Sequence, residues 1–420
     1  MLNDKKIAVL GAGIVGINCA IALQEAGFQV TLIDKSGIGE GCSKGNAGHF
    51  ATEQVFPLAE KSLLWQLPKM LLDPLGPIAL SPSYFPKALP WFLKFISNMF
   101  EGKRNRNKRA LKTLNELAIQ SYRDLLTRAG AEHLMVTDGS LFVFETKDRS
   151  EVEKHYNMYK NEGVAVELLD REQTFALEPN LNRKINFSLY FTEVGHTRNP
   201  HEVCTVLAAY AQSIGVEVIH DEIQAIKQGQ NCATLVSTKQ EYSFDNLLVA
   251  TGAWSKKVVE PLGYKLPLEV ERGYSLDLAA TDHNKLSRPV ASAERKFIIT
   301  PMSHGLRFAG TVEFAGLEQS ANMERAHMLH RNAYHVLAHV PNFEASNAKD
   351  EQQWMGFRPS LPDSLPVIGK APRHENIYFA LGHQHLGLTL GAITGELIKQ
   401  VFLGEQTKVD ISPFCISRFD

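Results

Sequence analysis

Three glycines and one carboxylate near the start of the chain have the types and spacing needed to bind a dinucleotide. Gly11, Gly13 and Gly16 follow an apolar run, and Asp34 ends the next apolar run about 20 residues later. In such a motif the first glycine permits a tight turn, the second lets the backbone approach a pyrophosphate, and the third lets a helix pack closely on a sheet. The carboxylate can accept hydrogen bonds from both hydroxyls of a ribose. The motif predicts an adenine dinucleotide and leaves NAD and FAD both open.

The elements that must position these residues lie in the same segment, KKIAVLGAGIVGINCAIALQEAGFQVTLID. Its pattern predicts a buried parallel strand at 7–10, a helix at 14–26 and a second strand at 29–33. The helix begins beside the glycines, where its unpaired N–H groups and its dipole favour a phosphate. Ile14 and Val15 in the first helical turn, and Lys35 after the second strand, are counted with the predicted cofactor-binding residues.

Length and composition are those of a globular protein with two domains. A chain of 420 residues is too long for one compact core, and 44% apolar with 21% charged residues is typical of folds that face water. A formal net charge of −2 gives no reason to expect nucleic acid as a partner. The five cysteines are scattered and lack CxxC spacing, which favours a reducing compartment. Because no apolar run has the length of a membrane span, we expect a cytoplasmic protein.

Four later motifs decide between the two dinucleotides. They are GCSKGNAG at 41–48, VATGAWS at 249–255, GFRPSLPDSLPVIG at 356–369 and GHQHLGLTLG at 382–391. In their order and spacing, together with GAGIVG and Asp34, the chain resembles the D-amino-acid oxidase-like superfamily of FAD-dependent oxidoreductases over nearly its whole length. Within it, the D-amino-acid dehydrogenase branch is the most similar, and GNAGHFATEQVFPLA looks like the D-hydroxyproline dehydrogenases. The resemblance implies FAD as the cofactor.

Segments of α/β character occur in three separate blocks with strand-rich material between them, so the domains are expected to be discontinuous. The fold class that we predict is α/β with α+β: a Rossmann-like FAD-binding domain of the GR2 type and an interleaved substrate domain with a mixed or antiparallel sheet. The predicted FAD-binding domain comprises residues 1–60, 185–260 and 352–420. The predicted substrate-binding domain comprises residues 61–184 and 261–351.

The resemblance also implies cofactor contacts beyond the N-terminal motif. Ser43, Asn46 and Gly48 belong to a loop that approaches the phosphates and the flavin, and Gly252 makes a second contact. Backbone N–H groups and a helix N-terminus are expected against the flavin at His385, Gly387, Leu388 and Thr389. A helix dipole there would stabilise the negative charge of a reduced flavin. No metal is expected, because His383 and His385 have no carboxylate or third ligand near them in the sequence.

Arg358 is the main candidate for binding a substrate. It matches the family's carboxylate-binding arginine, and a guanidinium binds a carboxylate in bidentate fashion better than a lysine does. His49 either lines the pocket over the flavin or is a buried structural histidine. Arg272 and Tyr274 start a strand where they contact either the substrate or only the sheet edge. At 297–299 the chain has Phe-Ile-Ile where oxidases of the family often carry a tyrosine, which favours an apolar pocket and a cyclic substrate.

These features together predict an FAD-dependent dehydrogenase of D-amino or imino acids, with D-hydroxyproline or D-proline favoured. The substrate carboxylate would bind Arg358, and hydride transfer from Cα to flavin N5 would give an imine. Two alternatives stay open: an oxidase of glycine, sarcosine or D-amino acids that uses O₂, and a flavin subunit of a heteromeric dehydrogenase. The electron acceptor of the dehydrogenase would be a quinone or another carrier.

Residues 85–109 raise the question of a membrane surface. Five apolar residues precede the cationic run EGKRNRNKR: Trp91, Phe92, Phe95, Met99 and Phe100. Such a segment can lie on the anionic inner face of the cytoplasmic membrane and pass electrons to a quinone. Alternatively, the aromatic residues pack against the substrate domain and the basic run is the solvated start of a helix.

Overall fold

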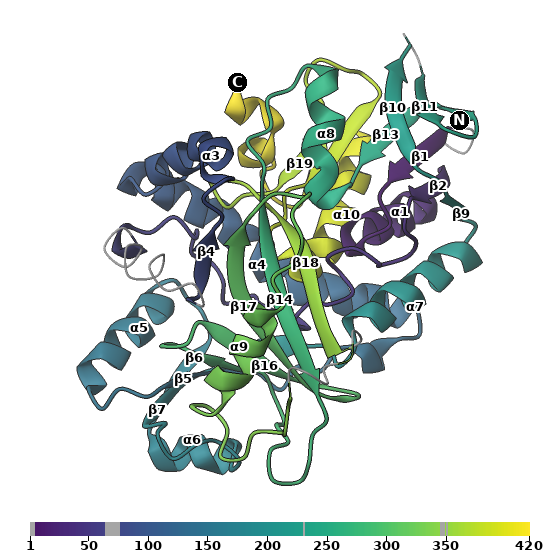
Figure 1. Cartoon of the computed structure of the whole chain (residues 1–420). Helices are drawn as coiled ribbons and strands as arrows, with labels where there is room; N and C mark the ends of the chain where they lie inside the picture. The colour runs from purple at the N-terminus through teal and green to yellow at the C-terminus, as the bar shows by residue number, and fades with distance from the viewer. Residues whose placement is uncertain (1–4, 64–75, 230–231, 345–348, 350–351) are drawn as a thin grey trace.

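The computed structural model describes residues 5–63, 76–229, 232–344, 349 and 352–420. Part of the proline-rich segment that precedes residue 85 lies outside the described residues. The described chain forms two large sheets, and strands β14 and β18 run through the middle of the molecule between the two parts (Figure 1). Both chain ends lie in the upper part of this view.

A six-stranded sheet forms the dinucleotide-binding part. Its strands, in spatial order, are β19 (Val367–Lys370), β20 (Ile377–Leu381), β13 (Asn246–Val249), β1 (Lys6–Leu10), β2 (Gln29–Asp34) and β9 (Glu217–His220). All neighbours are parallel except β19 and β20. Because parallel strands end at the same edge, the carboxyl ends of β1, β2 and β13 meet where ligands bind in such sheets.

Both faces of this sheet are covered, which explains why β1 is an uninterrupted apolar run. Ile7 and Val9 pack on the side of four helices, whereas Ala8 and Leu10 pack on the side of a three-stranded sheet. The helices are α1 (Ile14–Glu25), α4 (Glu101–Arg128), α7 (Pro200–Ser213) and α10 (Gly387–Leu403). The small sheet consists of β10 (Ile223–Gln228), β11 (Ala233–Ser237) and β12 (Glu241–Phe244). The predicted strand, helix and strand are confirmed to within one residue at each end.

A nine-stranded mixed sheet forms the second part. Its strands, in order, are β18 (Gln353–Ser360), β14 (Glu269–Leu278), β17 (Gly305–Phe314), β16 (Phe297–Met302), β15 (Val290–Ser292), β5 (Ser140–Phe144), β7 (Phe187–Phe191) and β6 (Val166–Leu169), with β4 (Ile78–Leu80) also paired to β17. Strands β7 and β18 lie in this sheet, although both fall inside the ranges predicted for the FAD-binding domain. The fold class is confirmed, whereas the domain boundaries stay a prediction.

The remaining elements join and cover the two sheets. A short pair, β3 (His49–Phe50) and β8 (Gly195–His196), brings the chain after the glycine-rich loop against α10. The other helices are α3 (Phe85–Ser97), α5 (Arg149–Asn161), α6 (Arg171–Leu177), α8 (Ser255–Val259) and α9 (Glu324–Ala333). The 3₁₀ turns are η2 (Glu132–Leu134), η3 (Gly252–Trp254), η4 (Glu260–Leu262), η7 (Ser412–Phe414) and η8 (Ile416–Phe419).

Two segments of the second part end or begin at contacts between residues far apart in the chain. The helix α9 ends at Ala333, and Leu337 then makes an isolated bridge to Leu181. The first residues of the motif at 356–369 continue β18 to Ser360 because they pair with β14. Within the described part of the chain, every helix is too short or too polar to cross a membrane.

Candidate functional site

A cavity of about 670 Å³ lies at the carboxyl edge of the parallel sheet. It has the size of a typical ligand site. Eleven of the fifteen predicted cofactor-binding residues line it: Gly11, Gly13, Ile14, Val15, Asp34, Lys35, Ser43, Asn46, Gly252, Gly387 and Leu388. The other four, Gly16, Gly48, His385 and Thr389, lie outside its lining.

The N-terminal turn leaves the start of α1 open to this cavity. A Cβ on Gly11 would lie 2.8 Å from the carbonyl carbon of Ala250, and the φ of Gly11 is 111°, so only glycine fits there. The α1 helix begins after Gly13 without a side-chain cap and without an acidic residue in its first turn. Ser43 accepts one of its free amides, Ile14 N–H, at 3.1 Å. These observations fit an anion such as the pyrophosphate of FAD.

Asp34 is held rigidly at the end of β2. Its carboxylate accepts the backbone N–H groups of Ala12 at 2.8 Å, Ser36 at 2.7 Å and Gly37 at 3.1 Å. Each carboxylate oxygen has two lone pairs, and Oδ1 already accepts two N–H groups, so Oδ2 keeps one lone pair for a ribose hydroxyl. Beside it, the Lys35 ammonium lies 4.7 Å from the centre of the Trp254 ring. Trp254 also lines the cavity, and the VATGAWS motif gave the only signal for it in the sequence.

The N-terminus of α10 faces the other end of the cavity. The helix starts after Leu386 without a side-chain cap, and Gly387 and Leu388 line the cavity. Thr389 instead accepts the backbone N–H of Ala51 at 3.0 Å, which ties the chain after β3 to α10. His385 is partly buried, and its desolvation together with the Arg358 charge lowers its pKa to about 4. The neutral imidazole and the free helix amides fit the flavin end of FAD.

Arg358 projects from β18 onto the same face as Gly273 of β14. A Cβ on Gly273 would lie 2.7 Å from Arg358 Nε, so the absent side chain makes room for the guanidinium. Within the described residues, the guanidinium donates one hydrogen bond, from Nη1 to the Thr311 carbonyl oxygen at 3.2 Å. Its charge acts on Cys42, which lines the cavity, and on His385. Its remaining donors are available to a carboxylate.

Arg272 and Tyr274 are not placed to bind a substrate, which corrects one of the two alternatives above. Arg272 is fully buried, and its guanidinium donates to the carbonyl oxygens of Gly316 at 2.8 Å, Ser320 at 3.0 Å, Ala315 at 3.4 Å and Gln319 at 2.6 Å. The Tyr274 hydroxyl donates to Glu313 at 2.6 Å. Both side chains therefore fix the segment after β17.

The strand at 297–299 also differs from its expected role. Phe297 and Ile299 pack into the apolar core beneath α9, and only Ile298 lies on the opposite face, because it pairs with Ala309 of β17. Two residues that the sequence did not reveal shape this other face. Arg307 pairs with Asp277 at 2.6 Å and donates to the Asn46 carbonyl oxygen at 2.7 Å, which holds the glycine-rich loop. The Trp354 ring lies against Gly45 and Gly356.

His49 lies at the start of β3 and forms a pair with a carboxylate four residues later. Its Nε2 is 3.0 Å from Glu53 Oε1, and both side chains are nearly buried. The charges of His49, Glu53 and Arg358 all act on the pKa of His385. Glu53 was not predicted from the sequence, although the i, i+4 spacing of a histidine and a glutamate was a signal for it.

Three comparisons with known proteins agree on the family. The model of the DAO family, "FAD dependent oxidoreductase", matches residues 6–401. The chain is 34% identical to a D-amino-acid oxidase of Bradyrhizobium diazoefficiens over 100% of both chains. It is 29% identical to a D-amino acid dehydrogenase of Vibrio vulnificus, over 96% of this chain and 97% of that one. The structure superposes on a glycine oxidase from Geobacillus kaustophilus with a TM-score of 0.73 at 20% identity, covering 99% of each chain. The chain belongs to the DAO family of FAD-dependent oxidoreductases.

Proposed function

We propose that this enzyme oxidises D-amino or imino acids, with D-hydroxyproline or D-proline favoured, and that it acts as a dehydrogenase. One observation carries the proposal: Arg358 presents free guanidinium donors beside the FAD cavity. The relatives named D-amino-acid oxidase and D-amino acid dehydrogenase support the same substrate class.

In the proposed reaction the protein holds the substrate by its carboxylate. A bidentate bond to Arg358 fixes the distance and direction of the carbon next to that carboxylate. FAD, when bound, supplies the chemistry by accepting a hydride from this carbon. The substrate nitrogen must first lose a proton, since its lone pair forms the new C=N bond. Asp34, Gly13 and the N-terminus of α1 hold the nucleotide end, and α10 holds the flavin end.

The face around Arg358 favours a substrate with an apolar ring. Trp354 lies next to Arg358 on β18, and Ile298 and Met302 of β16 occupy the same side of the sheet. A Cβ on Gly48 would lie 3.1 Å from Met302 Cε, which places Met302 against the glycine-rich loop. A five-membered ring can cover this apolar surface, and it loses no internal freedom on binding.

Anaerobic reduction of the flavin tests the substrate class. The wild-type holoenzyme is mixed with a panel of D- and L-amino acids and imino acids, and bleaching of the flavin absorbance is followed. Arg358→Met is expected to raise the apparent substrate Kd at least tenfold, because it removes the bidentate pair. Arg106→Met, on the exposed side of α4, is the control. An unchanged Kd in Arg358→Met, or bleaching only by L-substrates, contradicts the proposal.

An oxidase that uses O₂ is the second candidate, favoured by the name of the relative at 34% identity. The two are separated by turnover of the purified protein in air and with an artificial dye or quinone as acceptor. Rapid peroxide formation supports the oxidase, whereas turnover that needs the dye supports the dehydrogenase. A requirement for a second protein would indicate a subunit of a heteromeric enzyme.

We also propose that α3 rests on an anionic membrane surface, where a quinone accepts the electrons. Of the five apolar residues that precede the cationic run, Trp91 and Met99 are buried, with 5% and 3% exposure, whereas Phe100 is 64% exposed. Four apolar residues of α3 are also exposed: Phe85, Leu89, Leu93 and Ile96. Lys87, Lys94 and Lys103 are exposed beside them, which adds attraction to anionic lipid.

Sedimentation with vesicles tests this surface. Wild-type enzyme is expected to sediment with vesicles that contain phosphatidylglycerol and to stay in the supernatant with vesicles of pure phosphatidylcholine. Leu93→Glu, at the most exposed of the large apolar residues in α3, should abolish binding while leaving flavin reduction unchanged. Equal binding of Leu93→Glu and wild type would show that this surface does not contact lipid.

A further inference from the structure

A cluster of buried polar side chains between β3, β8 and α4 has more hydrogen-bonding atoms than partners. His49 and His196 stand directly opposite each other in the β3–β8 pair, so their side chains share a face. Within the described residues, five buried atoms of this cluster lack a hydrogen-bond partner: His49 Nδ1, Glu53 Oε2, His196 Nδ1, His196 Nε2 and Asn115 Oδ1. Buried polar atoms without protein partners are where proteins hold internal water.

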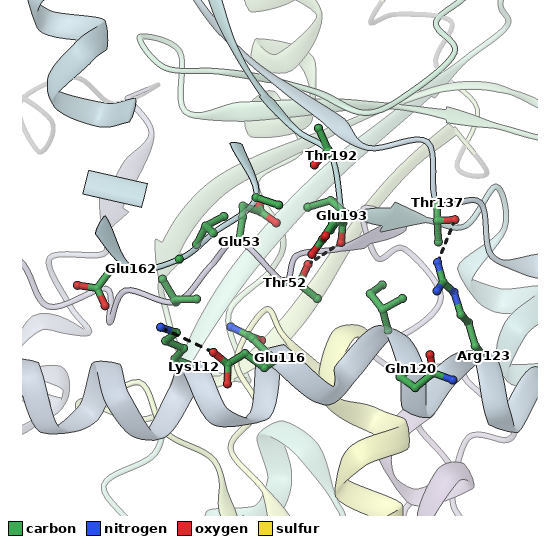
Figure 2. Close-up of a pocket in the computed structure, with 17 residues that line it drawn as sticks. Thr52, Glu53, Lys112, Glu116, Gln120, Arg123, Thr137, Glu162, Thr192 and Glu193 are labelled. Atoms are coloured by element: carbon green, nitrogen blue, oxygen red, sulfur yellow. Dashed lines mark hydrogen bonds and ion pairs between the residues drawn. The ribbon is translucent and has the colours of Figure 1, made fainter. Parts of the chain in front are cut away.

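The cluster borders a second cavity, of about 480 Å³, that shares no lining residue with the FAD cavity. Figure 2 shows Glu53 on one wall and Lys112, Glu116 and Gln120 rising from α4 on the other. The wall is polar and reaches solvent: Lys112 and Glu116 form an ion pair of 3.7 Å, and the Glu116 side chain is 59% exposed. Glu53 thus separates a water-accessible cavity from His49.

On its other side the cluster meets the region of the substrate. The charges of Arg358, Glu53 and His49 all act on the pKa of His385. The backbone N–H of Ala51 donates a hydrogen bond to Thr389 of α10. Gly48, the residue before His49, packs against Met302 on the sheet face that carries Arg358, so β3 borders the region where a substrate anchored at Arg358 would place its nitrogen. This nitrogen is the group that must lose a proton before hydride transfer.

We propose that His49 and Glu53 form a relay that carries the proton from the substrate nitrogen to solvent in the cavity of Figure 2. The proposal rests on the proposed function, that the substrate is an amino or imino acid. His49 Nδ1 accepts the N–H proton, and the N–H bond electrons remain on the substrate nitrogen as a lone pair. His49 Nε2 gives its own proton to Glu53 Oε1, and the carboxyl group releases a proton to water in the cavity. The hydrogen on Cα is not part of this relay. It would leave with both bond electrons, as a hydride, to the cofactor when that is bound.

The geometry sets the direction of this relay. If Nε2–H donates to Glu53, Nδ1 is the bare nitrogen and can only accept. Burial acts to raise the pKa of Glu53, but the charge and hydrogen bond of His49 outweigh it and keep that pKa below its usual value. The titratable and charged groups that face the pair are His196 of β8, His385 before α10, Arg358 of β18, Tyr159 of α5, Lys112 of α4 and Glu60.

The rate of flavin reduction against pH tests the relay. Glu53→Gln keeps the shape and a hydrogen-bonding oxygen but removes the carboxylate. With the best substrate of the panel, its limiting rate of anaerobic reduction is expected to fall about 100-fold at pH 7, the size of a general-base contribution. The rate should approach that of wild type above pH 10, where the substrate amine is deprotonated in solution. Glu193→Gln, which lines the same cavity without contacting His49, should match wild type at every pH.

Two results would overturn the relay. One is an unchanged rate at pH 7, and the other is the same fractional loss at all pH values, which a purely structural defect would produce. A second measurement does not depend on activity: ¹⁵N spectra of histidine-labelled holoenzyme, with the His49 signal assigned from its loss in His49→Asn. The expected form in wild type carries the proton on Nε2 and none on Nδ1, and the reverse tautomer refutes the relay. If no amino or imino acid reduces the wild-type flavin, the proposed function fails, and the tautomer still decides whether the pair is arranged for transfer.

Discussion

Gly16→Ala is expected to disturb the FAD-binding turn although alanine is the better helix former. In α1 the exchange gains about 1 kcal/mol of helix propensity. A Cβ at residue 16, however, would overlap the carbonyl oxygen of Gly11 and lie 3.0 Å from its carbonyl carbon. Gly11 cannot retreat freely, because its N–H donates to the Ile33 carbonyl oxygen at 2.8 Å. Overpacking against backbone costs about 3 kcal/mol, so a net loss of about 2 kcal/mol remains.

The same displacement should weaken FAD binding, because it moves the start of α1 away from the pyrophosphate. A shift of only 1.4 kcal/mol corresponds to a tenfold higher Kd, so we expect at least about that change. Urea denaturation of the apoprotein measures stability, and quenching of flavin fluorescence measures the Kd. Gly102→Ala is the control: it also lies in a helix, nothing lies within 4 Å of its Cβ, and it should stabilise α4 by up to about 1 kcal/mol. If Gly16→Ala is as stable as Gly102→Ala and binds FAD like wild type, the steric argument is wrong.

Three further predictions concern charge and protonation. Arg272→Met should lower the free energy of unfolding by about 3 kcal/mol, because four carbonyl oxygens and Glu313 lose their buried partner. Urea denaturation measures this loss, and Arg358→Met is the control, whose urea midpoint should stay close to that of wild type. Burial lowers the pKa of His196 to about 4, of His385 to about 4 and of His383 to about 3, from an ordinary histidine value of 6.5. The stability that these neutral imidazoles contribute is therefore fully present above pH 6.5 and is lost as the pH falls toward 4. Urea unfolding at pH 7 and pH 5 should show a fall of up to about 1.4 kcal/mol per pH unit and histidine, and a flat profile would contradict this. Asp34→Ala should raise the Kd for FAD about 10- to 100-fold, as flavin fluorescence would show, because a charge-assisted acceptor for the ribose is lost.

Local pattern alone was enough for the dinucleotide unit. The apolar run at β1, the three glycines, α1 and Asp34 follow one another within a short segment, and each constrains the next through backbone geometry. The structure keeps this unit to within one residue because every contact in it is short in sequence. The close approach of α10 to α1 is seen only in the structure, where a Cβ on Gly395 would lie 2.7 Å from the Asn18 carbonyl oxygen.

The substrate region depended on contacts that no local pattern reveals. Arg272 and Arg358 are both arginines in strands, and they stand in neighbouring strands of one sheet. Only the fold shows that Arg272 points into a nest of carbonyl oxygens while Arg358 lies over Gly273 with free donors. Side chains alternate between the two faces of a strand, and this alternation decides which face each arginine occupies. The register that fixes the alternation is set by pairing between residues far apart in sequence.

The sequence by itself determined the family, the FAD fingerprint and the arginine that we propose as the substrate's carboxylate partner, because these reside in short motifs with fixed spacing. The tertiary structure alone decided that His49, Glu53 and His196 form one buried cluster beside a solvent cavity, since β3 and β8 come from opposite ends of a long insertion. Burial is what gives those side chains their chemistry: an imidazole and a carboxylate that are nearly shielded from water must satisfy each other.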